Sequence, residues 1–351
     1  MPDHRYPEIA VAGSPREMGR QIGDAVGELI RGFCAIAMER VNKTVRITRN
    51  AALDVAAKSI PYAEQYAPHM VEELRGTAEA AGVTLEELML LQVRNQLRSP
   101  DAGCTSLSSG PPRSRQRFVA QNWDNDPALD EFTIVLTRRP TGYPANTTLT
   151  QAGLIGYIGF NDAGVGMCLN SLPAPSRPLG VPHYFVVREI LECRSLNEAV
   201  HAVNRAERAI PANIMLSTPQ GPADLEVTID AVHILTDPQS GLVTHTNHCK
   251  HPALVAINPQ FSELIQSYAR QSRVDELLTK NHSEPLSLAE IQAALRNHVD
   301  YPRSMCRHAN DDNEYGFWQT VFSVIIAPES REMYITRGTP CDHRYERYMI
   351  A

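Results

Sequence analysis

The chain has 351 residues, of which 43% are hydrophobic and 21% charged, and 33 Lys and Arg against 40 Asp and Glu give a formal net charge of −7. This composition predicts a globular protein with a sizeable core, and the acidic balance disfavours nucleic acid or an anionic membrane surface as a partner. The chain has no apolar run of about 18 residues and no N-terminal pattern of a secretory signal. We therefore expect a cytoplasmic protein with no membrane span.

The cysteines are odd in number, and their spacing argues against a cross-linked or metal-bound framework. Seven of them are scattered along the chain without a CxxC pair. Such usage predicts reduced thiols rather than disulfides or a structural zinc site. A single cysteine is then free to serve as a nucleophile.

The N-terminal part of the chain has helical patterning. A helix is expected after Ser14-Pro15, with Ile22, Val26, Leu29, Ile30 and Phe33 at helical spacing. Further helices are predicted over Ala51–Tyr66, over Pro68–Ala81 with Gly82 as its cap, and from the capping box of Thr84 and Glu87 through Val93.

The pattern changes near residues 99–103, after which short apolar runs alternate with turn residues. Strands are expected over 118–121, 132–136, 154–160, 165–169, 212–217, 225–229, 242–246, 320–326 and 333–336. Helices are expected over 185–193, 196–207, 259–279 and 287–298. This order predicts an α+β fold with antiparallel sheets rather than regular βαβ alternation.

The sequence Gly103-Cys104-Thr105-Ser106 stands where the helical pattern gives way to strands. A lone cysteine is usually an inert small residue, but here a glycine precedes it and hydroxyl residues follow. A glycine leaves its carbonyl open to attack by the next side chain. Cleavage at that bond would make Cys104 an N-terminal residue, whose α-amino group has a pKa of about 7.7–8.0 and can serve as the base for its own thiol.

Gly103-Cys104-Thr105 and Ala120-Gln-Asn-Trp-Asp124 resemble the acyl-coenzyme A:isopenicillin N acyltransferase family of N-terminal nucleophile (Ntn) hydrolases. Further similar segments follow in the same order: Gly13-Ser-Pro with Gly19 and Gly23, Gly156 to Gly164, His245-Thr-Asn-His248, Ser304-Met-Cys-Arg-His308, Thr320 to Ile325, and Gly338-Thr-Pro340. The resemblance implies a four-layer αββα sandwich. It also implies cleavage between Gly103 and Cys104 into a helical segment, 1–103, and a segment 104–351 that carries the nucleophile, the two fragments staying associated.

Carried over by position, the resemblance makes Cys104 the nucleophile and Asp124 an acidic residue that orients its amino or thiol group. Asn247 then supplies an amide to an oxyanion hole, and Arg307 holds the thiolate or a substrate carboxylate. From the residues alone, Asp124 and Asn247 equally suit capped turns, and Arg307 a structural ion pair.

Other residues are weaker candidates. Tyr157 and Asn122 are candidate substrate-binding residues, although Tyr157 also suits the sheet core and Asn122 a packing or turn position. Cys306 is interpreted as a small buried residue and His308 as a structural histidine. The group His245, His248, Cys249 and His251 resembles a metal site by composition only, so no metal is expected.

We therefore expect a self-processing cysteine amidohydrolase that acts on small N-acyl amides through a thioester and needs no cofactor. One alternative is an acyl-CoA-dependent N-acyltransferase, because hydrolysis and transfer share their first half-reaction; no glycine-rich phosphate loop or basic cluster favours it. A second alternative is a non-catalytic binder of an acylated metabolite.

Overall fold

Two β-sheets form the centre of the molecule in the computed structural model, which describes residues 4–41, 46–97, 103–111, 116–279 and 285–349. The larger sheet has the strand order β1-β4-β5-β6-β7-β8-β9-β10 and the smaller β11-β2-β3-β12-β13-β14. The strands are β1 (Glu8–Gly13), β2 (Gly103–Ser109), β3 (Phe118–Asn125), β4 (Thr133–Pro140), β5 (Asn146–Gln151), β6 (Ile158–Asn161), β7 (Gly166–Asn170), β8 (Ala212–Thr218), β9 (Gly221–Val227), β10 (Val232–Leu235), β11 (Leu242–His245), β12 (Gln319–Ala327), β13 (Glu332–Arg337) and β14 (Glu346–Met349).

The sheets pack face to face, with β2 and β3 of the smaller sheet against β7 and β8 of the larger. All pairs between these strands are antiparallel except β1 with β4, which is parallel. The expected α+β class with mainly antiparallel sheets is therefore confirmed.

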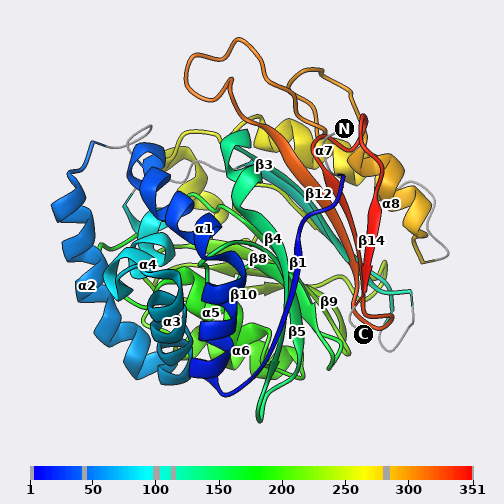
Figure 1. The fold of residues 1–351 in the computed structure, drawn as a ribbon. Helices are drawn as coiled ribbons and strands as arrows, with labels where there is room; N and C mark the ends of the chain where they lie inside the picture. The colour runs from blue at the N-terminus through cyan, green and yellow to red at the C-terminus, as the bar shows by residue number, and fades with distance from the viewer. Residues whose placement is uncertain (1–3, 42–45, 98–102, 112–115, 280–284, 350–351) are drawn as a thin grey trace.

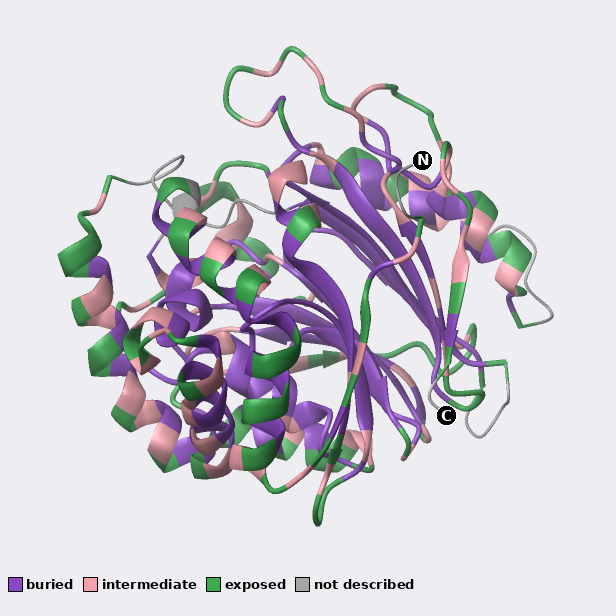
Figure 2. Ribbon diagram, viewed as in Figure 1, coloured by how far each residue is buried: buried purple, intermediate pink, exposed green. Residues whose placement is uncertain are grey.

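Helices cover the outer face of each sheet (Figure 1). The larger sheet is covered by α1 (Pro15–Val41), α2 (Arg49–Tyr66), α3 (Pro68–Ala81), α4 (Leu85–Val93), α5 (His183–Ile190) and α6 (Leu196–Arg205). The smaller sheet is covered by α7 (Ser267–Thr279) and α8 (Leu288–Leu295). The result is the expected four-layer αββα sandwich. Figure 2 shows the consequence: the central strands are buried on both sides, whereas the helices keep one exposed face.

The helices before residue 94 form as their sequence predicts. Thr84 accepts a hydrogen bond from the backbone N–H of Glu87, whose side chain accepts one from the Thr84 N–H, so the capping box is present. Gly82 ends α3 in the left-handed conformation, at φ 70°. No helix in the described ranges is long and apolar enough to cross a membrane.

Two predicted elements are wrong in part. The strand expected over 154–160 begins only at Ile158, because Gly153 turns the chain at φ 93° and the backbone at Gly156 lies close against Arg188. The helix expected over 259–279 begins only at Ser267, since Ile265 and Gln266 have positive φ values that interrupt a right-handed helix.

Strands β1, β2, β5, β10 and β14 were not predicted. They are short runs without a clear alternating pattern, and the sheet itself supplies their partners. Most of the predicted junction at residues 99–103 lies outside the described residues; Gly103 is the first residue of β2.

Candidate active site

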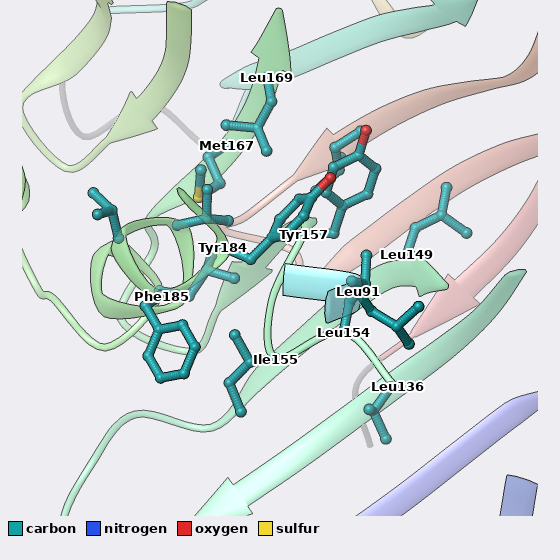
Figure 3. Close-up of a cluster of buried hydrophobic side chains, with 14 of the residues drawn as sticks. Leu91, Leu136, Leu149, Leu154, Ile155, Tyr157, Met167, Leu169, Tyr184 and Phe185 are labelled. Atoms are coloured by element: carbon teal, nitrogen blue, oxygen red, sulfur yellow. The ribbon is translucent and has the colours of Figure 1, made fainter. Parts of the chain in front are cut away.

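Cys104 is the second residue of β2, and its side chain lies between the two sheets. Its Cα pairs with that of Trp123 on β3. The thiol lines a cavity whose walls include the rings of Trp123, Tyr157 and Tyr184 and the side chains of Leu169 and Leu172. Tyr157, Tyr184 and Leu169 come from three separate segments and meet in one buried cluster (Figure 3). The Cys104 thiol thus faces a pocket that combines aromatic and aliphatic walls with polar residues such as Asn125 and Asn170.

The peptide groups on both sides of Cys104 are held by Asn247 and Arg270. The backbone N–H of Cys104 donates to Asn247 Oδ1 at 2.9 Å, and Arg270 Nη1 donates to the Cys104 carbonyl oxygen at 2.5 Å. Arg270 Nη2 also donates to Asn247 Oδ1 at 2.8 Å. The Asn247 amide nitrogen donates to the Ser171 carbonyl at 2.9 Å. Asn247 therefore contacts the amide nitrogen of the Gly103–Cys104 bond directly, and Arg270 fixes the orientation of the Asn247 side chain.

Asp124 lies beside Gly103: the two residues are paired across β2 and β3, and the Asp124 charge acts on the Cys104 thiol. Thr320 Oγ1 donates to its Oδ1 at 2.7 Å, while its buried Oδ2 has no hydrogen-bond partner among the described residues. Burial raises the pKa of Asp124 to about 6, although the charges of Arg270 and Arg307 and the Thr320 hydrogen bond oppose the shift. The free oxygen is placed to accept a proton or an N–H.

The thiol itself is not activated in the uncleaved chain. Burial and the Asp124 charge raise the pKa of Cys104 to about 12, against the weaker opposing effects of Arg270, the Gln121 side chain and the Ser171 backbone N–H. At neutral pH the thiol is therefore protonated, and its attack on a carbonyl requires a base.

Only glycine fits before Cys104. A Cβ on Gly103 would lie 1.7 Å from Cδ1 of Ile265 and 3.6 Å from Cβ of Asp124. Ile265 itself has a φ of 32°, just before α7. The Ile265 side chain occupies the space that a Cβ at position 103 would need, and this steric conflict explains the glycine. The sequence suggested other reasons, the conformational freedom of glycine and its accessible carbonyl.

Of the remaining predicted residues, Tyr157 lines the cavity, whereas Arg307 and Asn122 do not. Tyr157 lines the cavity beside Cys104. Arg307 is buried near Asp124, its Nη1 donating to Gln266 Oε1 at 2.9 Å, but it does not line that cavity. The Asn122 amide donates to the carbonyls of Leu295 and Met305, so the structure places it under α8 and not in the cavity.

The histidine-rich segment after β11 does not gather into one ligand set. His245 is buried with its Nε2 2.9 Å from Glu226 Oε1, and Glu226 also accepts the backbone N–H groups of Lys250 and His251. His248 instead contacts Ser267 through Nδ1 at 2.8 Å. Both carboxylate oxygens of Glu226 thus already accept hydrogen bonds, and the contacts form a structural network.

Sequence reasoning missed Arg270, Thr320 and Ser171. A signal for Arg270 did exist: α7 buries Ser267, Arg270, Gln271, Val274 and Leu278, so an arginine stands on the inward face of a helix. A charge at such a position needs a buried partner. Thr320 opens one of the segments that resemble the family, but its contact with Asp124, like the place of Ser171 beside Cys104, is created only by the folded chain.

A family described as "Acyl-coenzyme A:6-aminopenicillanic acid acyl-transferase" matches residues 112–342. The acyl-coenzyme A:6-aminopenicillanic-acid-acyltransferase 40 kDa form of Emericella nidulans is 27% identical over 341 residues, covering 95% of this chain and 92% of that protein.

Solved structures are also similar, at low sequence identity. Penicillin V acylase from Agrobacterium tumefaciens is 14% identical, with a TM-score of 0.47, covering 66% of this chain and 82% of that one. A mutant conjugated bile acid hydrolase from Clostridium perfringens is 13% identical, with a TM-score of 0.46, covering 71% and 97%. The match of the family to most of the chain is what decides the assignment: this protein belongs to the acyl-coenzyme A:6-aminopenicillanic acid acyltransferase family.

Proposed function

We propose that this chain is a precursor that cuts itself between Gly103 and Cys104 and then acts as a cysteine amidohydrolase on small N-acyl amides. The observation that carries the proposal is the setting of Cys104. Its thiol faces an apolar cavity while its backbone N–H is held by Asn247, and a carboxylate oxygen without a partner among the described residues lies beside the preceding glycine. A pocket that only bound a metabolite would need neither contact.

Self-cleavage uses groups already in place. The thiol loses its proton to Asp124, and Sγ forms a bond to the Gly103 carbonyl carbon. When the Gly103–Cys104 C–N bond breaks, the nitrogen takes up a proton and becomes the α-amino group of Cys104. Water then hydrolyses the Gly103 thioester, releasing a carboxylate and the free thiol. Asn247 Oδ1, which accepts the Cys104 N–H before cleavage, accepts an N–H of the amino group afterwards.

Turnover repeats the same chemistry on an external amide. The α-amino group of Cys104 takes the thiol proton, and Sγ attacks the substrate carbonyl to give a thioester. The oxyanion lies near the Ser171 backbone N–H and the Asn247 amide, and the acyl chain occupies the cavity walled by Trp123, Tyr157 and Tyr184. The leaving amine takes the proton, and water resolves the thioester.

The rate of self-cleavage is expected to rise with pH through about 6 and then level off. Only the ionised Asp124 accepts the thiol proton, and burial raises the pKa of this carboxyl to about 6. We would measure precursor made by cell-free synthesis and diluted to between about pH 4 and 8, followed by denaturing electrophoresis. Asp124→Asn should stay largely uncut at every pH.

The free energy of unfolding should instead fall as pH rises. Because the folded pKa exceeds the unfolded one, Asp124 loses stabilising free energy as pH rises from about 4 to 6, on the order of 3 kcal/mol. Asp224 is a matched control, since burial also raises its pKa to about 6 while its partner is Asn213. Asp224→Asn should flatten the stability profile yet leave cleavage intact. A normal cleavage profile in Asp124→Asn would refute the role of this carboxyl.

Hydrolysis and acyl transfer are both compatible with the family, and its members named above include an acyltransferase. We favour hydrolysis because Arg94 is the one arginine or lysine among the described residues that line the cavity, and its Nη1 already donates to the Leu91 carbonyl. Coenzyme A carries several phosphates, which need several cationic partners.

The expected product of a processed enzyme is therefore the free acid, at a rate almost independent of added amine. A transferase binds its amine at the position that water would otherwise occupy. The effective molarity of an amine positioned in this way is roughly 10⁵ M or more, so the amine takes nearly all acyl groups. The measurement is the acid-to-amide ratio by mass spectrometry across an amine titration, after screening N-acyl amino acids, acyl amines, β-lactams and acyl-CoA thioesters for turnover. Saturable capture of most acyl groups by one amine would establish the transferase instead.

A further inference from the structure

Four metal-ligating side chains meet outside the cavity described above, where two loops of the smaller sheet come together. His298, Cys306 and His308 belong to the segment between α8 and β12, and Cys341 to the segment between β13 and β14. Their ligand atoms all lie within 4.8 Å of one another. Cys306 is buried, His308 and Cys341 are half-buried, and His298 is exposed, so the group lies at the surface with one side open to solvent.

The distances within this group are close to those of a tetrahedral zinc site. His298 Nε2 lies 3.2 Å from His308 Nε2, which lies 3.7 Å from Cys306 Sγ and 3.4 Å from Cys341 Sγ. Zinc bonds of about 2.0–2.1 Å to nitrogen and 2.3 Å to sulfur imply edges of about 3.3 Å between nitrogens and 3.5 Å between nitrogen and sulfur. The three observed edges match these values without any movement of the side chains.

Hydrogen bonding alone does not account for this arrangement. A ring nitrogen of histidine makes one hydrogen bond, as donor or as acceptor, yet His308 Nε2 faces the second imidazole and both sulfurs. A cation between the four atoms satisfies all of them at once. We propose that His298, Cys306, His308 and Cys341 form a structural zinc site.

The surrounding backbone is already fixed in a form that suits such a site. Cys306 N–H donates to the Asn297 carbonyl at 3.2 Å, and His308 N–H donates to the Pro302 carbonyl at 2.9 Å. The Cys306 carbonyl accepts from Ser304 Oγ at 2.6 Å. Because these ligands are held by bonds that do not involve their side chains, little ordering is needed when the ion binds.

Binding replaces two thiol protons by one divalent ion, so the two thiolates and Zn²⁺ sum to zero charge. Two sulfurs and two imidazoles in a tetrahedron are the donor set preferred by zinc over the harder cations magnesium and calcium.

The ion would tie the α8–β12 segment to the β13–β14 segment. Arg307 stands between two of the ligands, and its backbone N–H donates to the Thr320 Oγ1 that also holds Asp124. The metal therefore supports the loop that carries Arg307 without touching the reacting atoms. The zinc site does not rest on the proposed activity, because metal content is measured independently of turnover.

The test is the metal content of the full-length protein, expressed with zinc supplied, dialysed against metal-free buffer and analysed by inductively coupled plasma mass spectrometry. We expect about one zinc per chain. His298→Ala and Cys341→Ser should each lower zinc affinity by more than about 100-fold while the protein keeps its circular dichroism spectrum. Cobalt-loaded protein should show the intense absorption of tetrahedral thiolate-bound Co²⁺, which Cys341→Ser weakens.

His251→Ala and Cys249→Ser are matched controls, because they alter the same residue types in the segment after β11. Both should retain zinc. Zinc loss in these variants with retention in His298→Ala would overturn the proposal. So would a wild-type protein that takes up no zinc with its thiols reduced, or one in which peptide mapping finds Cys306 joined to Cys341 by a disulfide.

Discussion

Purified wild-type protein is expected to separate under denaturing conditions into residues 1–103 and 104–351, and Cys104→Ala to remain whole and inactive. The variant lacks the sulfur that attacks the Gly103 carbonyl, and Asn247, Arg270 and Asp124 do not replace a nucleophile. Sequencing of the larger fragment should begin Cys-Thr-Ser-Leu. Intact mass and Edman sequencing are the measurements.

Cys193→Ala is the matched control for this experiment, because Cys193 is another buried thiol, which donates to the Glu189 carbonyl in the α5–α6 connection. It should be processed like the wild type. Cleavage of Cys104→Ala at the same bond would assign the cut to an external protease and remove the thiol from processing.

Asn247→Ala is expected to lower kcat of the processed enzyme by roughly 10²–10³, the usual loss for one oxyanion donor. Asn247 makes two kinds of contact: its Oδ1 accepts from Cys104 N–H and Arg270, and its amide nitrogen donates to Ser171. Asn247→Asp keeps the acceptor and removes the donor. If donation to the oxyanion matters most, the two variants lose turnover equally.

The control is Asn213→Ala, which removes another buried asparagine whose amide donates to Asp224 in the larger sheet. It should lower stability more than kcat. Unchanged kcat and kcat/KM in Asn247→Ala would exclude Asn247 from the reaction. Steady-state kinetics on processed protein, with the uncut fraction subtracted, decides between these results.

Local chemistry explains which elements the sequence could predict. The helices α3 and α4 carry their own end signals, a left-handed Gly82 and the capping box of Thr84, so the sequence predicts them without knowledge of tertiary contacts. Strand β1 carries none: it exists because β4 offers a parallel edge. The late start of α7 depends on backbone strain at Ile265, whose side chain must pack over Gly103.

The same distinction holds for the site. Motif order was enough to predict that Cys104, Asp124 and Asn247 would belong to one centre, and the structure brings them together. It separates Asn122 from the cavity, because the Asn122 amide donates to the carbonyls of Leu295 and Met305 under α8. The sequence could indicate that Arg270 is buried but not which group it binds, since its partner is the carbonyl of Cys104 and a carbonyl has no sequence signature.

Two segments from opposite ends of this sequence are hydrogen-bonded to each other: the backbone N–H of Tyr6 donates to the Tyr348 hydroxyl at 2.7 Å, and Arg5 donates to the Arg347 carbonyl. The proposed new ends arise instead at the start of the buried strand β2. A processed molecule thus has a chain start at Cys104, as a circularly permuted protein would. Translation does not produce a chain that begins there. If the proposed self-cleavage occurs, the amino group needed for turnover forms only after β2 has paired with β3, so a misfolded copy would not acquire its base. The proposed cleavage would then make activity depend on correct folding.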